Sequence, residues 1–302
     1  MSRYADTERR TIHHDGMDRT YALHLPPELD QTGRRVPVLV ELHGSGSHPE
    51  QQFRVSGLHR VAEELGLVHV LPQAAIPLTL FPGWEPGYAW NVPGVPLPHA
   101  DGAGQPHSAD DISFIGALLD ELDRLLPLDR RRIYLAGYSG GGRLCSHLLY
   151  AREGFAAAGI VAGLRRPRGA AGRAHPRDDR PHRLPSIVAF HGTADPVNPF
   201  KGGPDARWDA GVLETAAAIA ADADAEPLPR RYRVSDGARL VRYVDPSGHP
   251  LVDQYVLEGG VHTWPGSHDD EHARLFGGIS REIDASAIMS RLFGTTALGN
   301  RN

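Results

Sequence analysis

Short runs of β-branched and apolar residues alternate with helix-like stretches along most of this 302-residue chain, which restricts its fold more than any other feature. The run Val36–His43 reads VPVLVELH, and Arg132–Gly137 and Ser186–His191 are similar. Continuous apolar runs are typical of strands buried on both faces, and strands that alternate with helices indicate a parallel sheet covered on both sides. We therefore expect an α/β protein with a mostly parallel sheet of about eight strands.

The individual elements follow from periodicity and from turn residues. An initial hairpin is expected to turn at Asp15-Gly16, and a second pair of strands to flank Pro246-Ser247-Gly248. Asp110 or Asp111 is expected to cap the helix that follows. The predicted strands are Thr11–His14, Arg19–His24, Val36–His43, Leu67–Pro72, Arg132–Gly137, Ala157–Ala162, Ser186–His191, Leu240–Asp245 and Val252–Leu257, and the predicted helices are Gln52–Leu65, Asp111–Leu126, Arg143–Arg152 and Asp284–Phe293.

Three irregular stretches interrupt this pattern, at residues 77–107, 164–185 and 204–229, the last of which includes an Ala-rich helix. Each follows a predicted strand, and loops at the carboxyl ends of parallel strands build the binding crevice of such folds. Long loops of this kind are often functional. We expect one domain over residues 1–302, with these loops inserted in it.

Composition excludes several classes of protein. The net charge is −5 and the basic residues are scattered, which argues against nucleic acid as a partner. Cys145 is the single cysteine, so the chain forms no internal disulfide. The polar N-terminus has no apolar segment of the secretory type, and no run is apolar enough to span a membrane. We expect a cytoplasmic protein, or a secreted one if a leader has been removed.

The run Gly137-Tyr138-Ser139-Gly140-Gly141 matches G-x-S-x-G, between a predicted strand and a predicted helix. In this motif the serine lies at a sharp turn that exposes its hydroxyl, and larger side chains two residues away on either side would collide. We predict that Ser139 is a nucleophile. The motif alone is weak evidence for a nucleophile, because a glycine-rich turn without a catalytic role has the same sequence pattern.

A serine nucleophile needs a histidine base and an acid that orients it, here in the chain order Ser, Asp, His. Asp195 follows the strand Ser186–His191, and His262 follows the strand Val252–Leu257 in the run LEGGVHTWPG. We predict that these two complete a triad, while His272 and other histidines are weaker choices. The backbone N–H groups of Ser45 and Gly140 are the expected oxyanion donors.

Several stretches resemble the family of polyhydroxybutyrate depolymerases and feruloyl or acetylxylan esterases (carbohydrate esterase family 1 and its relatives). They are DGMDRTYALHLPPEL, VPVLVELHGSGS, YAWNVPG, DDISFIGALLDEL, RRIYLAGYSGGG, FHGTADPVNPFKGG and EGGVHTWPG. The resemblance implies an α/β-hydrolase fold, the triad Ser139, Asp195 and His262, oxyanion donors at Ser45 and Gly140, and cofactor-free hydrolysis of carboxylic esters.

The chain also departs from this family. Many secreted relatives carry cysteine pairs, one of them at the place of Ser45, and a polymer-binding module; neither is visible here. A small or oligomeric ester is therefore the expected partner: a hydroxyalkanoate oligomer, a feruloyl or acetyl ester, or a natural-product ester. Tyr138, Trp90 and Trp264 are expected to line its pocket, although plain packing would equally account for the tryptophans.

Two other functions use or replace this chemistry. Acyl transfer or lactone formation needs the same triad, but an alcohol or amine attacks the acyl-enzyme in place of water. A non-catalytic binding protein would usually lack one triad member. A metal site has no support, because His13 and His14 are adjacent on a strand and point to opposite faces, and no nucleotide-binding loop of the GxxxxGK[ST] type exists.

Overall fold

The computed structural model describes residues 4–27, 29, 34–80, 86–96, 109–167, 183–205 and 207–299. It contains the strands β1 (Glu8–His14), β2 (Met17–His24), β3 (Val36–Leu42), β4 (Val68–Pro72), β5 (Ile76–Leu78), β6 (Gly87–Ala89), β7 (Leu128–Tyr138), β8 (Ala157–Val161), β9 (Ser186–Gly192), β10 (Arg230–Arg233), β11 (Ala238–Val244) and β12 (Pro250–Leu257). Its helices are η1 (Tyr4–Asp6), α1 (Pro49–Ser56), α2 (Leu58–Leu65), α3 (Asp111–Leu125), α4 (Gly140–Ala151), α5 (Val212–Asp222), α6 (Asp270–Phe276) and α7 (Ala285–Thr295).

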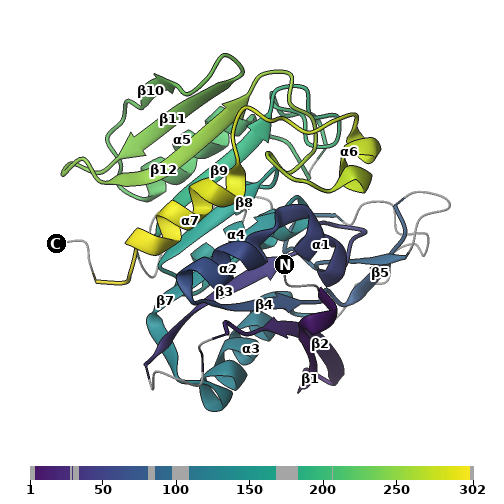
Figure 1. The fold of residues 1–302 in the computed structure, drawn as a ribbon. Helices are drawn as coiled ribbons and strands as arrows, with labels where there is room; N and C mark the ends of the chain where they lie inside the picture. Colours follow the sequence, from purple (N-terminus) through teal and green to yellow (C-terminus); the bar gives the residue numbers. More distant parts are fainter. Residues whose placement is uncertain are drawn as a thin grey trace.

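One large sheet runs through the molecule in the order β1-β2-β4-β3-β7-β8-β9-β12-β11-β10. The strands from β4 to β12 in this order are parallel to their neighbours, and antiparallel pairs extend the sheet at both ends. Figure 1 shows this twisted sheet with helices on both sides. A parallel sheet needs such cover because both of its faces are apolar.

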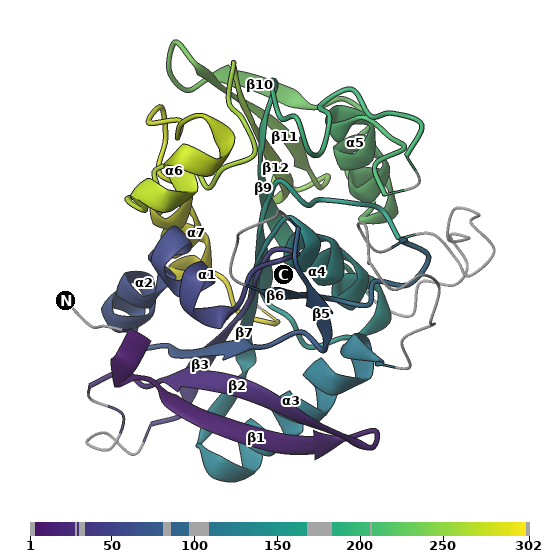
Figure 2. The same ribbon diagram turned by 90° about the vertical axis from the view of Figure 1, so that its right-hand side faces the viewer.

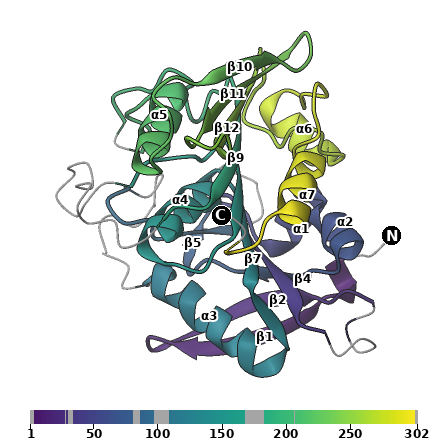
Figure 3. The ribbon, with the colours of Figure 1, turned by 90° about the vertical axis from the view of Figure 1, so that its left-hand side faces the viewer.

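The helices form two layers. α1, α2 and α7 cover one face, and α3, α4 and α5 cover the other, as the edge-on views in Figures 2 and 3 show. Side chains alternate along the central strands: Val38 and Val40 of β3 pack in the cluster with α3 and α4, whereas Leu39 packs in the cluster with α2 and α7. The two apolar clusters are thus separated by the sheet.

The structure confirms the predicted hairpin, in which Asp15 and Gly16 both have positive φ, and it confirms Asp110 as the N-cap of α3. The observed elements differ from the expected ones in three respects. In the described residues the sheet has ten strands, where about eight were expected, since β10 reads RRYR and is an exposed edge strand without apolar alternation. The helix expected at Gln52–Leu65 is two helices, because Gly57 adopts φ 64° between them.

The third difference concerns the irregular stretches, of which the structure describes only part. Residues 76–89 contain the short antiparallel pair β5 and β6, while 81–85, 97–108 and 168–182 lie outside the described residues. Within 204–229 the Ala-rich segment forms α5, as expected. No helix in the described ranges is long and apolar enough to cross a lipid bilayer.

Candidate active site

Ser139 lies at the sharp turn between β7 and α4, with φ 51° and ψ −112°. Left-handed backbone conformations of this kind are strained for residues other than glycine, and they persist where the surroundings fix them. The Ser139 N–H donates to the Val161 carbonyl at 2.9 Å, and the Arg143 N–H donates to the Ser139 carbonyl at 3.0 Å. Backbone contacts on both sides therefore hold the strained serine in place.

The glycines of the motif are required by close approach. A Cβ atom built on Gly137 would lie 2.8 Å from the backbone of Gly141, and one on Gly141 would lie 2.2 Å from the Leu42 carbonyl oxygen. Real side chains do not tolerate such distances. The collision expected from the sequence is thus present, and it explains both glycines.

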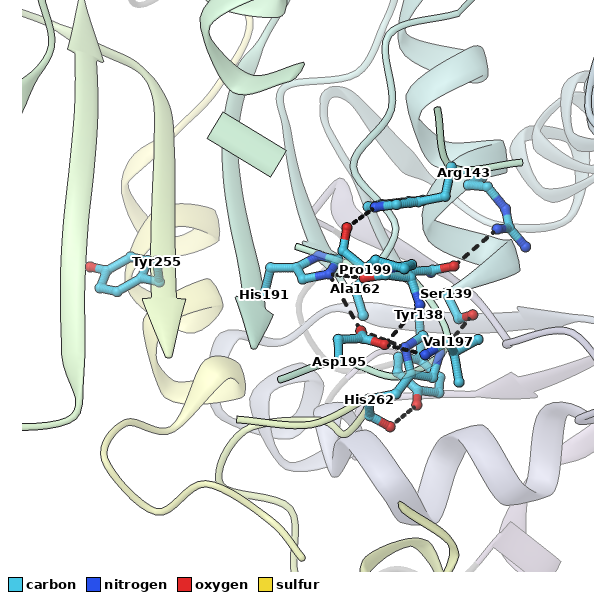
Figure 4. Close-up of polar contacts among 12 residues, drawn as sticks. Tyr138, Ser139, Arg143, Ala162, His191, Asp195, Val197, Pro199, Tyr255 and His262 are labelled. Atoms are coloured by element: carbon cyan, nitrogen blue, oxygen red, sulfur yellow. Dashed lines mark hydrogen bonds and ion pairs between the residues drawn. The ribbon is translucent and has the colours of Figure 1, made fainter. Parts of the chain in front are cut away.

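His262 connects the serine to the acid. Its Nε2 lies 3.0 Å from Ser139 Oγ, and its Nδ1 lies 2.7 Å from Asp195 Oδ2. Figure 4 shows the three side chains gathered together. They come from loops after β7, β9 and β12, so the fold brings together residues that are 123 and 67 positions apart in the chain. All three are buried.

Asp195 is held as a carboxylate by its surroundings. Burial alone would raise its pKa, but the adjacent His262, His191 and the backbone N–H of Asn198 lower it, and the net shift is downward. Its Oδ1 accepts the N–H groups of Val197 and Asn198, each at 2.8 Å. The second carboxylate oxygen, Oδ2, is left to accept the Nδ1–H of His262, which fixes the tautomer with Nε2 free to take a proton.

Sequence reasoning missed a second histidine, His191 at the end of β9. Its Nε2 lies 2.8 Å from the Asn198 carbonyl and 3.3 Å from Asp195 Oδ2. Burial lowers the pKa of His191 to about 4, so the ring is neutral at physiological pH. The neutral ring contacts the Asp195 loop at Asn198 and at Asp195 itself. In the sequence, only the position of His191 shortly before Asp195, in the run FHGTAD, could have indicated this role.

Ser45 and Gly140 face each other across the site. A Cβ built on Gly140 would lie 3.1 Å from the Ser45 nitrogen. Neither backbone N–H donates a hydrogen bond to any part of the chain that the structure describes. Two free N–H groups beside the Ser139 hydroxyl form an arrangement that can bind an oxyanion.

A cavity of about 400 Å³ opens on these residues. Its walls come from the loop after β3, the α1 helix, the loop after β9 and the α6 region. Tyr138 lines the cavity as expected, and its hydroxyl donates to the His262 carbonyl at 2.7 Å. The other lining residues are Gly44, Ser45, Gly46, Ser47, Gln51, Gln52, Val55, Leu80, Ser139, Arg143, Pro196, Val197, Asn198, Pro199, Gly203, Pro204, Asp205, Arg207, Trp208, His262, His272, Leu275 and Phe276.

Trp90 and Trp264 do not line this cavity, so their expected place in the pocket was wrong. The indole N–H of Trp90 donates to the His43 carbonyl at 2.8 Å, and the indole N–H of Trp264 donates to Ser286 Oγ at 3.0 Å. Both rings are buried. They support the loops that carry Ser45 and His262 rather than contact a substrate.

Three aromatic residues that sequence reasoning did not assign to the pocket line the cavity: Trp208, His272 and Phe276. His272 Nε2 accepts the backbone N–H of Trp264 at 3.0 Å, and Phe276 packs edge-on against His262. Phe276 and His272 belong to α6, which has no clear apolar period.

In the described ranges, no group of three or more His, Cys, Asp or Glu side chains is arranged to hold a metal ion.

Comparison with known proteins relates the chain to esterases. No protein-family model matches it. A protein from Nocardia uniformis subsp. tsuyamanensis named "Putative esterase NocK" is 26% identical over 93% of this chain and 81% of its own length.

Solved structures with a similar fold include an acetyl xylan esterase from Aspergillus awamori, with a TM-score of 0.58, 13% identity and coverage of 89% of this chain and 99% of that one. Another is Thermogutta terrifontis esterase 2 phosphorylated by paraoxon, with a TM-score of 0.53, 15% identity and coverage of 95% and 91%. Together with the sheet topology, these similarities identify the α/β-hydrolase fold in this chain.

Proposed function

We propose that this protein is a serine carboxylic ester hydrolase that works through an acyl-enzyme on Ser139. The observation that carries the proposal is the continuous chain of contacts from Ser139 Oγ through the His262 ring to the Asp195 carboxylate. A serine hydroxyl is a poor nucleophile at neutral pH, and a base positioned by an acid is the known means of activating it.

The geometry supports a two-step reaction. His262 Nε2 removes the hydroxyl proton as Ser139 Oγ attacks the ester carbonyl, and the resulting imidazolium gives that proton to the leaving alkoxide. A water molecule then attacks the acyl-enzyme, with the same nitrogen acting as base and then returning the proton to Ser139. Asp195 remains ionised throughout and stabilises the imidazolium.

The oxyanion of each tetrahedral intermediate would lie between the N–H groups of Gly140 and Ser45. Loss of one such donor typically costs about 2.7–4 kcal/mol of transition-state stabilisation. Because both donors belong to the backbone, this part of the site depends on loop geometry rather than on side-chain identity. The helix dipole of α4, which begins at Gly140, adds to the same effect.

We further propose a small or oligomeric ester as substrate, of the hydroxyalkanoate, feruloyl or acetyl, or natural-product type. A cavity of about 400 Å³ is within the usual range for small-molecule sites. The motifs shared with polyhydroxybutyrate depolymerases and feruloyl or acetylxylan esterases support this range. A panel of p-nitrophenyl esters of increasing acyl length, methyl ferulate, acetylxylan and 3-hydroxybutyrate oligomers would rank these classes.

The replacement Ser139→Ala tests the reaction itself. We expect the wild-type protein to cleave p-nitrophenyl butyrate and the variant to lose turnover while keeping its far-UV circular dichroism and its melting temperature. Fluorophosphonate labelling followed by mass spectrometry should place the adduct on Ser139. Turnover close to wild type in a folded Ser139→Ala variant would refute the assignment.

A further inference from the structure

Arg143 is a buried cation next to the proposed nucleophile. It belongs to α4, one helical turn after Ser139, whose carbonyl accepts its backbone N–H. Its side chain lines the cavity, yet the residue is only 6% exposed. Figure 4 shows Arg143 extending beside Ser139. The wall of the cavity in which the ester must bind therefore contains an enclosed guanidinium group.

In the described part of the chain, this guanidinium has no counter-ion within ion-pair distance. Its single hydrogen bond in the described chain runs from Nη1 to Asn198 Oδ1 at 3.5 Å, and its Nε has no partner there. The acceptor is a neutral amide, and the bond is longer than the normal range. No carboxylate of the described residues lies within ion-pair distance.

The two other arginines that are buried in the described part of the chain are paired. Arg19 contacts Asp111, and Arg165 contacts Asp209. A buried charge without a partner is costly, and proteins rarely keep one unless it has a function. Arg143 is the exception, and it is the one that lines the cavity beside Ser139.

Among the described residues, the charges around Arg143 leave the cavity positive. Burial lowers the pKa of Arg143 to about 10, and repulsion from Arg207 and Arg165 acts in the same direction, while Asp205 opposes it. The guanidinium thus stays protonated at neutral pH. Arg207 also lines the cavity, but it is paired with Asp205. The unbalanced charge among these three residues is that of Arg143.

We propose that Arg143 binds a carboxylate carried by the ester, so that the preferred substrates are esters with a free acid group. This inference rests on the proposed function and deepens it. A single unpaired guanidinium matches a monoanion better than a doubly charged phosphate. The apolar walls at Val197, Pro199 and Trp208 would remove water from the ion pair and strengthen it.

Matched substrates test the inference on the wild-type protein. In the acyl arm, p-nitrophenyl hydrogen adipate is compared with p-nitrophenyl 6-methylheptanoate, in which an isopropyl group replaces the carboxylate. In the leaving-group arm, 4-acetoxybenzoate is compared with 4-isopropylphenyl acetate. We expect kcat/KM, corrected for spontaneous hydrolysis, to favour the acid in one arm by about tenfold or more, because hydrogen bonds to charged groups are strong.

Substitution assigns the preference to this residue. In Arg143→Met the acid-to-neutral ratio of kcat/KM should fall by about 10- to 100-fold, and Arg143→Lys should retain part of it. Arg124→Gln removes an equal charge from an exposed position on α3 and should leave the ratio unchanged. The comparison of substrates on the wild-type protein needs no variant. The inference can therefore be refuted even if Arg143→Met does not fold.

The outcomes separate the two proposals. Cleavage of the neutral esters without preference for the acid in either arm would overturn the role of Arg143 and leave the esterase assignment standing. Failure to cleave any of the four esters would overturn the esterase assignment itself. An acid preference that survives Arg143→Met would also refute the inference.

Discussion

Replacing Asp195 by Asn would test how the carboxylate sets the tautomer of His262. The amide oxygen must keep the place of Oδ1, which accepts the N–H groups of Val197 and Asn198 at 2.8 Å. An NH₂ group there would leave two buried donors unbonded, at a cost of about 1–3 kcal/mol each. The opposing contact is a single longer one, from His191 Nε2 at 3.3 Å to the Oδ2 position. The amide nitrogen should therefore face His262.

That orientation inverts the imidazole. The amide donates to Nδ1, so the ring proton moves to Nε2, the nitrogen that lies 3.0 Å from Ser139 Oγ and must accept its proton. Recovering the productive tautomer requires turning the amide, at about 2–6 kcal/mol, and the imidazolium also loses a charged partner worth about 1.5–3 kcal/mol. Together these costs are about 3.5–9 kcal/mol, so that, at about 1.4 kcal/mol per factor of ten, we expect kcat to fall by about 10²- to 10⁶-fold.

Initial rates with p-nitrophenyl butyrate at neutral pH measure this effect, with circular dichroism and thermal melting as checks of the fold. Asp245→Asn is the matched control, because Asp245 Oδ1 also accepts two backbone N–H groups, of Ser247 and His249, in the turn between β11 and β12. That variant should keep wild-type kcat. A folded Asp195→Asn protein with a loss smaller than about tenfold would show that the tautomer argument is wrong.

Three further predictions concern stability and the turn at the serine. Asp111→Ala removes the partner of the buried Arg19 guanidinium and should lower the free energy of unfolding by about 3–5 kcal/mol. The neighbouring Asp110→Ala removes only a helix cap, at a cost of about 1 kcal/mol. Equal losses of the two variants in urea unfolding would contradict this difference. Gly141→Ala should reduce kcat/KM by about 100-fold by shifting the turn, and wild-type rates in that variant would contradict the 2.2 Å approach. Burial lowers the pKa of His43 and of His191 to about 4, against about 6.5 in an unfolded chain. Between these values the unfolded chain binds more protons, so stability should fall with decreasing pH by about 1.4 kcal/mol per unit for each histidine; a urea midpoint that is unchanged between about pH 7 and pH 5 would refute it.

The elements of the fold that the sequence predicts are those with strong local signals. The apolar strands β3, β7 and β9 and the hairpin β1-β2 are confirmed because burial on both faces, or an Asp-Gly turn, leaves a distinct pattern. The edge strand β10 escaped prediction because its side chains are exposed and its pairing with β11 depends on the backbone alone. The break at Gly57 was missed because the apolar spacing continues across it.

The sequence by itself determined the order of Ser139, Asp195 and His262 after three strands, because a strained serine turn requires glycines at fixed spacing and parallel strands end at one edge of the sheet. Only the tertiary structure decided which side chains face the cavity. Trp90 and Trp264 are buried and are not among its lining residues, and Arg143 lines it without a carboxylate partner in the described chain. Exposure and charge pairing depend on residues that are distant in sequence, so no local pattern records them.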